Sequence, residues 1–295
     1  MAPKLGAMNA NPEPLDAAPA PYEPPPPFTL GNEIAVLQWR DPLVWLGRGW
    51  QDVRQAKGIA LFYGLCFWAM AVLLGAVFRN SPEYVISMAS GCLLVGPFLA
   101  MGLYDVSRCH EAGRTPQLVH SLTCWRTNLR SMGLLVLVLI VLELLWGRAS
   151  LVVFAVFFNT GMPSTTGVIE AVFNADNWEF LVAYLIVGSG FAGLVFATAA
   201  VSIPMILDRD TDAISAAITS LQVVFTNLGV MILWGVLLTA LVLVALLPWG
   251  AGLLLVGPWL GHATWHAYRG SVHWPEGAKL SPETAPATAE RANTP

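Results

Sequence analysis

The chain has 295 residues, of which 56% are hydrophobic and 12% are charged, about half of the usual ~25%. Its net charge is −4, and its 15 Lys and Arg residues are scattered along the chain, which excludes the basic surface that a nucleic-acid-binding protein needs. A chain with this small a share of polar residues cannot cover the core of a soluble protein of this size. The composition therefore favours an integral membrane protein over a soluble enzyme.

The N-terminal segment, residues 1–38, is rich in Pro and Ala and includes the run Pro24 to Pro27. Such a composition gives a stiff, extended chain with too few apolar side chains to form a core. We therefore predict a disordered cytoplasmic tail over residues 1–38 and, on the same grounds, another over residues 271–295. Residues 39–270 are expected to form one membrane domain.

Apolar stretches between the charged positions are long enough to cross a bilayer, which takes ~20 residues of helix. In chain order they cover residues 58–78, 84–104, 132–158, 180–207, 229–247 and 251–268. The last two stretches are separated by the helix-breaking sequence Pro248-Trp249-Gly250. The sequence predicts an all-α membrane protein with six transmembrane helices arranged as three hairpins.

The distribution of Lys and Arg predicts the orientation of these helices. Thirteen of the 15 lie in the segments before the first span, between spans two and three, after span four and after span six. Arg79 lies on the opposite side, and Arg148 lies inside the third span. We therefore expect a bacterial inner-membrane protein with both termini in the cytoplasm.

A threefold internal repeat underlies the three hairpins. The residues Ser121, Leu122, Thr127, Asn128, Leu129 and Met132 recur 99 positions later as Ser220, Leu221, Thr226, Asn227, Leu228 and Met231. The sequence LLVGPFL at 93–99 also recurs as LLVGPWL at 254–260. Each hairpin should therefore have a proline in its second helix, at Pro97, Pro204 and Pro258.

A shorter amphipathic helix is expected before each hairpin, on the cytoplasmic side. In the second copy, Leu118, Leu122, Trp125 and Leu129 are spaced 4, 3 and 4 residues apart, as in one helical stripe. Similar stripes begin at Leu46 in the first copy and at Ile214 in the third. Such helices either lie at the membrane surface and end the hairpins, or form an inward-facing belt that gates the protein or docks a partner.

Several segments resemble a known family. They are WLGRGWQDV at 45–53, LLVGPFLAMGLYDVSR at 93–108, SIPMILDRDTDA at 202–213 and GPWLGHATWHAYR at 257–269. Over residues 40–270 the chain is similar to DUF2189, a family of predicted bacterial integral membrane proteins. The resemblance implies a helical fold in the bacterial inner membrane and no particular activity.

Polar residues inside the spans are the candidate functional residues, because ionisable groups are costly there. When the repeats are aligned on their prolines, Asp208 and His262 lie four residues after the proline, and Asp105 and His266 lie eight residues after it. Since two helical turns take ~7.2 residues, these groups could converge near the cytoplasmic end of the bundle.

The pair His262 and His266 has the i, i+4 spacing that places two rings on one helix face. The pair is a weak metal-site candidate, because the sequence does not place a third and fourth ligand. Alternatively, the two histidines bond to Asp105, Asp208 or the backbone, or act as a pH-responsive latch. We expect no metal and no cofactor.

Glu143 and Arg148 lie in the third span, five residues apart, so a direct ion pair between them would be strained. Arg148 could extend to the outer surface while Glu143 bonds across the bundle, or Glu143 could belong to a proton or solute pathway. A further acidic run, from Asp208 to Asp212, is expected to cap the helix that follows it.

The chain contains no Walker-type glycine loop, GxGxxG, HExxH or GxSxG motif. We therefore expect no catalytic residues and a non-enzymatic binding, assembly or organising protein of the membrane. Its partners would be the lipid bilayer and a membrane protein or a second copy of the chain, and not nucleic acid. The alternative is a transporter of a small solute, protons or metal ions that uses the polar residues above.

Overall fold

The computed structural model describes residues 32–81, 84–158 and 177–274, and within them the fold is almost entirely helical. Most of both predicted tails, residues 1–31 and 275–295, therefore lies outside the described residues. The elements are β1 (Glu33–Ile34), α1 (Asp41–Gln55), α2 (Lys57–Asn80), α3 (Val85–Glu111), α4 (Leu118–Ser121), the short 3-10 helix η2 (Cys124–Arg126), α5 (Leu129–Phe157), α7 (Trp178–Ala199), α8 (Ser202–Arg209), α9 (Ala213–Thr226), α10 (Leu228–Leu246), α11 (Leu253–Ser271) and β2 (Val272–His273).

Within the described residues, five helical stretches are long and apolar enough to cross a membrane. They are α2, the part of α3 from Met88 to Glu111, α5, α7 together with α8, and α10. Many of their large apolar side chains are exposed, and lipid is the solvent that suits such a surface. The chain is thus an all-α, multi-pass membrane protein.

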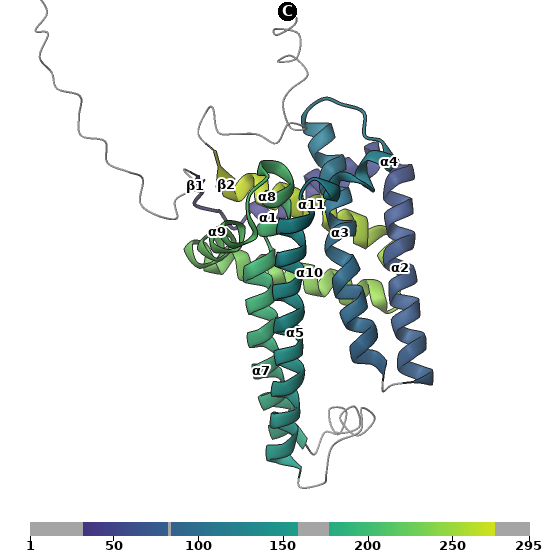
Figure 1. Ribbon diagram of the computed structural model, residues 1–295, viewed down its shortest axis with the longest axis vertical. Helices are drawn as coiled ribbons and strands as arrows, with labels where there is room; N and C mark the ends of the chain where they lie inside the picture. The colour runs from purple at the N-terminus through teal and green to yellow at the C-terminus, as the bar shows by residue number, and fades with distance from the viewer. Residues whose placement is uncertain (1–31, 82–83, 159–176, 275–295) are drawn as a thin grey trace, which may run out of the picture. The chain divides into compact units, whose positions relative to one another are not determined.

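The sixth predicted span is a helix, α11, but it is not among these five. Its C-terminal half carries two histidines and Arg269, which lower its apolar content, and much of the helix is buried against the rest of the protein. In Figure 1, α10 and α11 run across the view, whereas α2, α5 and α7 run along it. Six spans in three hairpins are therefore not confirmed.

The predicted amphipathic segments differ in how far they are helical. The first is α1 and the third is α9, but the stripe from Leu118 to Leu129 is broken into α4, η2 and the start of α5. In α9, Ile214 and Phe225 are exposed, while the buried face is made of smaller residues such as Ala216 and Thr219. The apolar stripe of α9 thus points away from the protein, as it would in a helix that contacts lipid.

Positions related by the repeat have similar surroundings. Asn128 and Asn227 are both buried, and each begins the helix after it. The amide of Asn128 donates to the carbonyl of Ile206 at 3.0 Å, and that of Asn227 donates to the carbonyl of Ala35 at 2.9 Å. Each asparagine therefore bonds to backbone that is distant in sequence, although the two acceptor carbonyls do not lie at equivalent positions of the repeat.

The three prolines are not equivalent in the fold. Pro97 and Pro258 lie inside the continuous helices α3 and α11. Pro204 is the third residue of α8, just after the break between α7 and α8. The first turn of a helix tolerates proline, because its N–H groups have no partner within the helix.

The helix α1 packs along α11, and this contact forms the centre of the fold. Pro42, Trp45, Leu46, Gly49, Asp52 and Val53 form the buried face of α1. A Cβ on Gly49 would lie 2.6 Å from the backbone nitrogen of Ala263, so only glycine permits this approach. The rings of Trp45 and Trp234 meet edge to face at 5.4 Å, which ties the α1–α11 pair to α10.

The strands β1 and β2 join the two ends of the described chain. They pair antiparallel, with Glu33 opposite His273 and Ile34 opposite Val272. Because these residues fall in the segments predicted as tails, the ordered domain extends beyond residues 39 and 270 at both ends. The same pairing places the residues before α1 next to those after α11.

Candidate functional site

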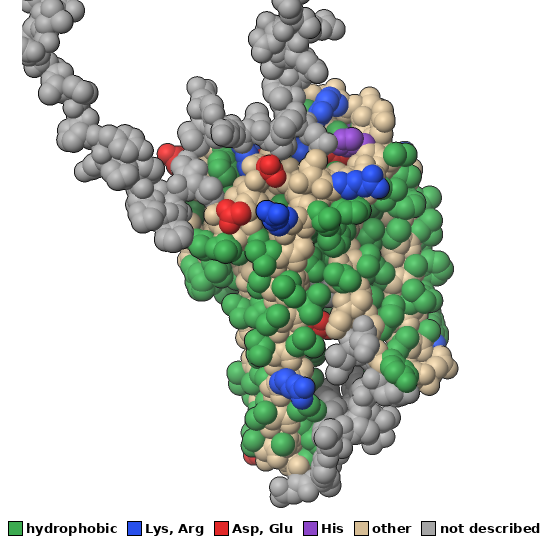
Figure 2. All heavy atoms as spheres, in the orientation of Figure 1, with side chains coloured by type: hydrophobic (Ala, Val, Ile, Leu, Met, Phe, Trp, Pro, Cys, Tyr) green, Lys and Arg blue, Asp and Glu red, His purple; other side chains and the backbone are tan. Residues whose placement is uncertain are grey.

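Polar side chains gather where α1, α3 and α11 meet. In Figure 2 this is the upper end of the molecule, where most of the visible charged side chains lie. We name the group the Asp52 cluster; its members are Asp52, Ser107, His110, His262 and His266. α1 supplies Asp52 from its buried face, the last turns of α3 supply Ser107 and His110, and α11 supplies the i, i+4 histidine pair. Ser107 and His262 are fully buried, and Asp52 is 5% exposed.

Asp52 is the acceptor at the centre of this cluster. One carboxylate oxygen accepts from Nδ1 of His110 at 2.9 Å. The other accepts from the Ser107 hydroxyl at 2.6 Å and from Nε2 of His266 at 2.8 Å. Since the Ser107 proton points to Asp52, Nδ1 of His262 donates to the Ser107 oxygen, at 2.8 Å. The three histidine bonds thus place the ring proton on Nδ1 in His110 and His262 and on Nε2 in His266.

The electrostatics of the cluster favour an ionised Asp52 and a neutral His262. Burial opposes ionisation of Asp52, but the hydrogen bonds from His110, His266 and Ser107 outweigh it and hold the pKa of the carboxyl well below its usual range. Burial lowers the pKa of His262 to about 4, although the Asp52 charge acts in the opposite direction. The site therefore holds one buried negative charge that is stabilised by donors.

A polar cavity of about 310 Å³ opens beside the cluster. Its lining combines the buried Asp52 and His266 and the partly buried His110 with residues nearer the surface, namely Arg48, Gln51, Gln55 and Glu111. Nδ1 of His266 is buried without a hydrogen-bond partner among the described residues and lies 3.6 Å from a carboxylate oxygen of Glu111. Amide, guanidinium, imidazole and carboxylate groups together can bind a polar ligand or a side chain of a partner.

A second polar group surrounds Asp208, at the end of α8. Its carboxylate accepts from the hydroxyl of Tyr268 at 2.8 Å and from Nε of Arg209 at 3.2 Å. Arg269 lies 3.6 Å from the same oxygen and donates to Glu111 at 3.1 Å, so it links this group to the polar cavity. Burial and the Asp208 charge raise the pKa of Tyr268 well above its ordinary value, which keeps this hydroxyl protonated.

Asp105 forms a third group on α3. It pairs with Arg108 at 2.6 Å, and Nδ1 of His120 donates to its other oxygen at 2.7 Å. Arg108 in turn donates to the carbonyl of Leu207 at 3.2 Å, next to Asp208 in the chain. The cation thus connects α3 to α8.

The residues predicted to converge are thus all buried, but they lie in three adjoining groups. His262 and His266 belong to the Asp52 cluster, and their side-chain hydrogen bonds go to Ser107 and Asp52 rather than to Asp105 or Asp208. Asp212, at the position equivalent to His266, is exposed and accepts from Ile214 N and Ser215 N at the start of α9, as expected for a cap. Within the described residues, no group of three or more His, Cys, Asp or Glu side chains could hold a metal ion.

Glu143 and Arg148 lie apart from these groups, on α5. Arg148 is exposed and Glu143 is partly buried, and the two form no ion pair. Among the described residues, Oε2 of Glu143 is buried without a hydrogen-bond partner, so the bond across the bundle is not observed. An unpaired carboxylate oxygen in a spanning helix is costly and marks a candidate for proton chemistry.

Asp52, Ser107 and His110 were not among the predicted site residues. The search followed ionisable residues inside spans, and Asp52 lies before the first span. A signal was nevertheless present, because Asp52 falls on the same helical stripe as Trp45, Leu46 and Gly49. A carboxylate on the apolar face of an amphipathic helix needs buried donors, and this pattern could have identified it.

The helices and their exposed apolar surface define the class of this protein as an integral membrane protein. Residues 85–208, which run from α3 to α8, match the family model DUF2189, described as a predicted integral membrane protein. The family resemblance is therefore confirmed over this part of the chain. No curated protein and no solved structure matches the chain. The matched residues include Ser107, His110 and Asp208 but neither α1 nor α11.

Proposed function

We propose that the protein is a non-enzymatic binding or organising protein of the bacterial inner membrane, and that the polar cavity beside the Asp52 cluster is where it binds. The observation that carries the proposal is that the polar region has a paired, buried interior and an open polar surface. Its buried charges are bonded to one another, while Arg48, Gln51 and Gln55 remain at the surface of the cavity. Such a site can bind a polar group without moving it across the membrane.

The proposal places this cavity in the cytoplasm, because most Lys and Arg residues lie in segments on that side. The pairing of β1 with β2 supports an even number of membrane crossings, since it brings the two ends of the described chain together. α11 then completes a hairpin with α10, so that its apolar first half enters the membrane and its polar second half returns to the Asp52 cluster.

Site-specific photo-crosslinking in cells tests the proposed binding site. A photoreactive amino acid at Gln51 or Gln55 should give one adduct of defined mass, because both residues line the cavity and are exposed. The matched control is Val152, which is 64% exposed but lies on α5. The adduct should weaken when Asp52→Asn is added. Equal labelling from all three positions would contradict a binding site in the cavity.

Transport remains a second candidate function because of Glu143. Its buried, unpaired oxygen on a spanning helix is what a proton-carrying carboxylate would show. In proteoliposomes loaded with a pH-sensitive dye, a transporter would carry protons at a rate that Glu143→Gln abolishes and Glu179→Gln leaves unchanged. Wild-type flux equal to that of empty liposomes favours the binding function.

A further inference from the structure

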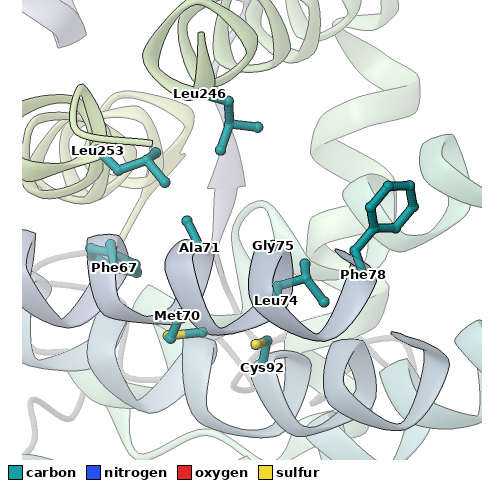
Figure 3. A pocket seen from close by; sticks show the side chains of 9 residues that line it. All are labelled: Phe67, Met70, Ala71, Leu74, Gly75, Phe78, Cys92, Leu246 and Leu253. Carbon is teal, nitrogen blue, oxygen red and sulfur yellow. The ribbon is translucent and has the colours of Figure 1, made fainter. Parts of the chain in front are cut away.

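An apolar groove of about 500 Å³ runs along the second half of α2, away from the polar groups (Figure 3). One face of α2 supplies most of its lining, at the helical spacing Phe67, Met70, Ala71, Leu74, Gly75 and Phe78. Leu246 at the end of α10 and Leu253 at the start of α11 form the opposite wall, and Cys92 of α3 lies at the side. Among the described residues, no charged side chain lines the groove.

The groove has the length of one membrane leaflet. The lining of α2 runs from Phe67 to Phe78, which is about 16 Å at the helical rise of 1.5 Å per residue. The hydrocarbon core of a bilayer is ~30 Å thick, so half of it is about the same length. Since α2 is a candidate membrane span, its second half covers one leaflet from the centre to the surface.

A cationic site lies at the outer end of this groove. Arg79 follows the lining residue Phe78, and its guanidinium lies 4.3 Å from the ring centre of Trp249. Trp249 is 73% exposed and has a φ of 54°, a left-handed conformation that is unfavourable for a bulky residue. This strained turn presents the ring beneath the guanidinium, and among the described residues no carboxylate pairs with Arg79.

We propose that this groove is a binding site for an anionic phospholipid, with one acyl chain along α2 and the phosphate on Arg79. Arginine binds phosphate through two parallel hydrogen bonds, and an interfacial tryptophan lies at headgroup level. The groove's length, its apolar lining and the cation at one end together match a lipid of a single leaflet. This site is separate from the polar cavity and goes beyond the binding function proposed for it.

Native mass spectrometry of the full-length protein in detergent tests this site, with dioleoylphosphatidylglycerol as the probe. Wild type should form a one-to-one complex. Gly75→Leu should weaken this complex at least about tenfold, because the added side chain occupies the groove where a Cβ meets no other atom. Gly147→Leu is the matched control, because Gly147 on α5 has the same open surroundings.

The headgroup contact is tested by a second pair of variants. Arg79→Gln should weaken phosphatidylglycerol binding about tenfold and leave dioleoylglycerol, which lacks the phosphate, unchanged. Arg148→Gln, which removes an exposed cation from α5, should change neither. Glycerol phosphate without acyl chains should not bind, because the groove supplies apolar contacts; binding of this free headgroup at Arg79 would overturn the lipid assignment.

Equal lipid binding by wild type, Gly75→Leu and Arg79→Gln would also overturn the proposal, because the lipid would then be bound only as ordinary surrounding bilayer. A measurement on wild type covers the case in which Gly75→Leu does not fold. A phosphatidylglycerol with a diazirine in its acyl chain should label residues 67–78 at least fivefold more than α5. Uniform labelling of the two helices contradicts a specific groove.

Discussion

At the scale of single residues, Asp52 shows how a membrane-associated fold holds a buried charge. Removing a carboxylate from water is costly unless donors replace its hydration. Ser107, His110 and His266 supply three such donors at 2.6 to 2.9 Å. Because these donors come from α3 and α11, the charge joins three elements.

The pH dependence of stability should report the neutral state of His262. Its pKa is lowered from 6.5 to about 4 in the folded protein, so between these values the unfolded chain binds a proton that the folded protein excludes. The free energy of unfolding should therefore decrease as the pH falls through this window, by roughly 1.4 kcal/mol per pH unit. Thermal unfolding in detergent from pH 7.5 to pH 4.5 measures this decrease.

The variant His262→Gln provides the control, because it keeps a polar side chain that does not titrate. Its dependence on pH in the same window should be weaker than that of wild type. Asp52 does not interfere there, since its lowered pKa removes stability only as the pH falls below its ordinary value of 3.8. The same dependence on pH in wild type and His262→Gln would show that His262 is not held neutral.

At the scale of secondary-structure elements, the contact between α1 and α11 positions the Asp52 cluster. Gly49 lies against the backbone of Ala263. Ala263 directly follows His262 in the chain and lies about one helical turn before His266. Asp52, one turn further along α1, then reaches His266 at 2.8 Å. The geometry of the cluster therefore depends on how closely two helix backbones approach.

Gly49→Ala should separate these helices. The new Cβ would lie within 2.9 Å of the backbone and Cβ of Ala263, and such overpacking costs roughly 1 to 3 kcal/mol. We expect a lower unfolding temperature than in wild type.

Gly47→Ala is the matched control on the same helix, because a Cβ there meets nothing within 4 Å. It should leave stability unchanged or raise it by up to ~1 kcal/mol, since alanine favours helix. Equal effects of the two variants would contradict the role of this contact.

The periodicity of the sequence predicted the membrane-spanning helices better than it predicted the segments whose structure depends on contacts with distant residues. It predicted α2, α3, α5, α7 and α10, because each is apolar over its own length and needs no distant residue to be stable in a bilayer. It failed for the segment from Leu118 to Leu129, where the helical stripe is split into α4, η2 and α5. There, hydrogen bonds of Ser121 and Asn128 to distant groups replace local helical order.

At the scale of the whole molecule, the pairing of β1 with β2 places the two ends of the described chain side by side, as the proposed even number of membrane crossings requires. If both strands lie in the cytoplasm, Gln51 lies on that side and Asn80, at the far end of α2, lies on the other. In a variant whose four cysteines are replaced by serine, Asn80→Cys should react with a membrane-impermeant maleimide added to intact spheroplasts. Gln51→Cys should react only after the membrane is permeabilised. The reverse labelling would contradict the predicted orientation.

The sequence by itself determined that this protein is a helical membrane protein, because hydropathy is a property of each segment. It also indicated the family and pointed to Asp105, Asp208, His262 and His266 as buried polar residues. Only the tertiary structure decided which of these groups meet. Asp52 and His266 are 214 positions apart, and they meet because α11 packs along α1. Such pairings depend on packing between distant segments, which the local pattern of apolar and polar residues does not encode.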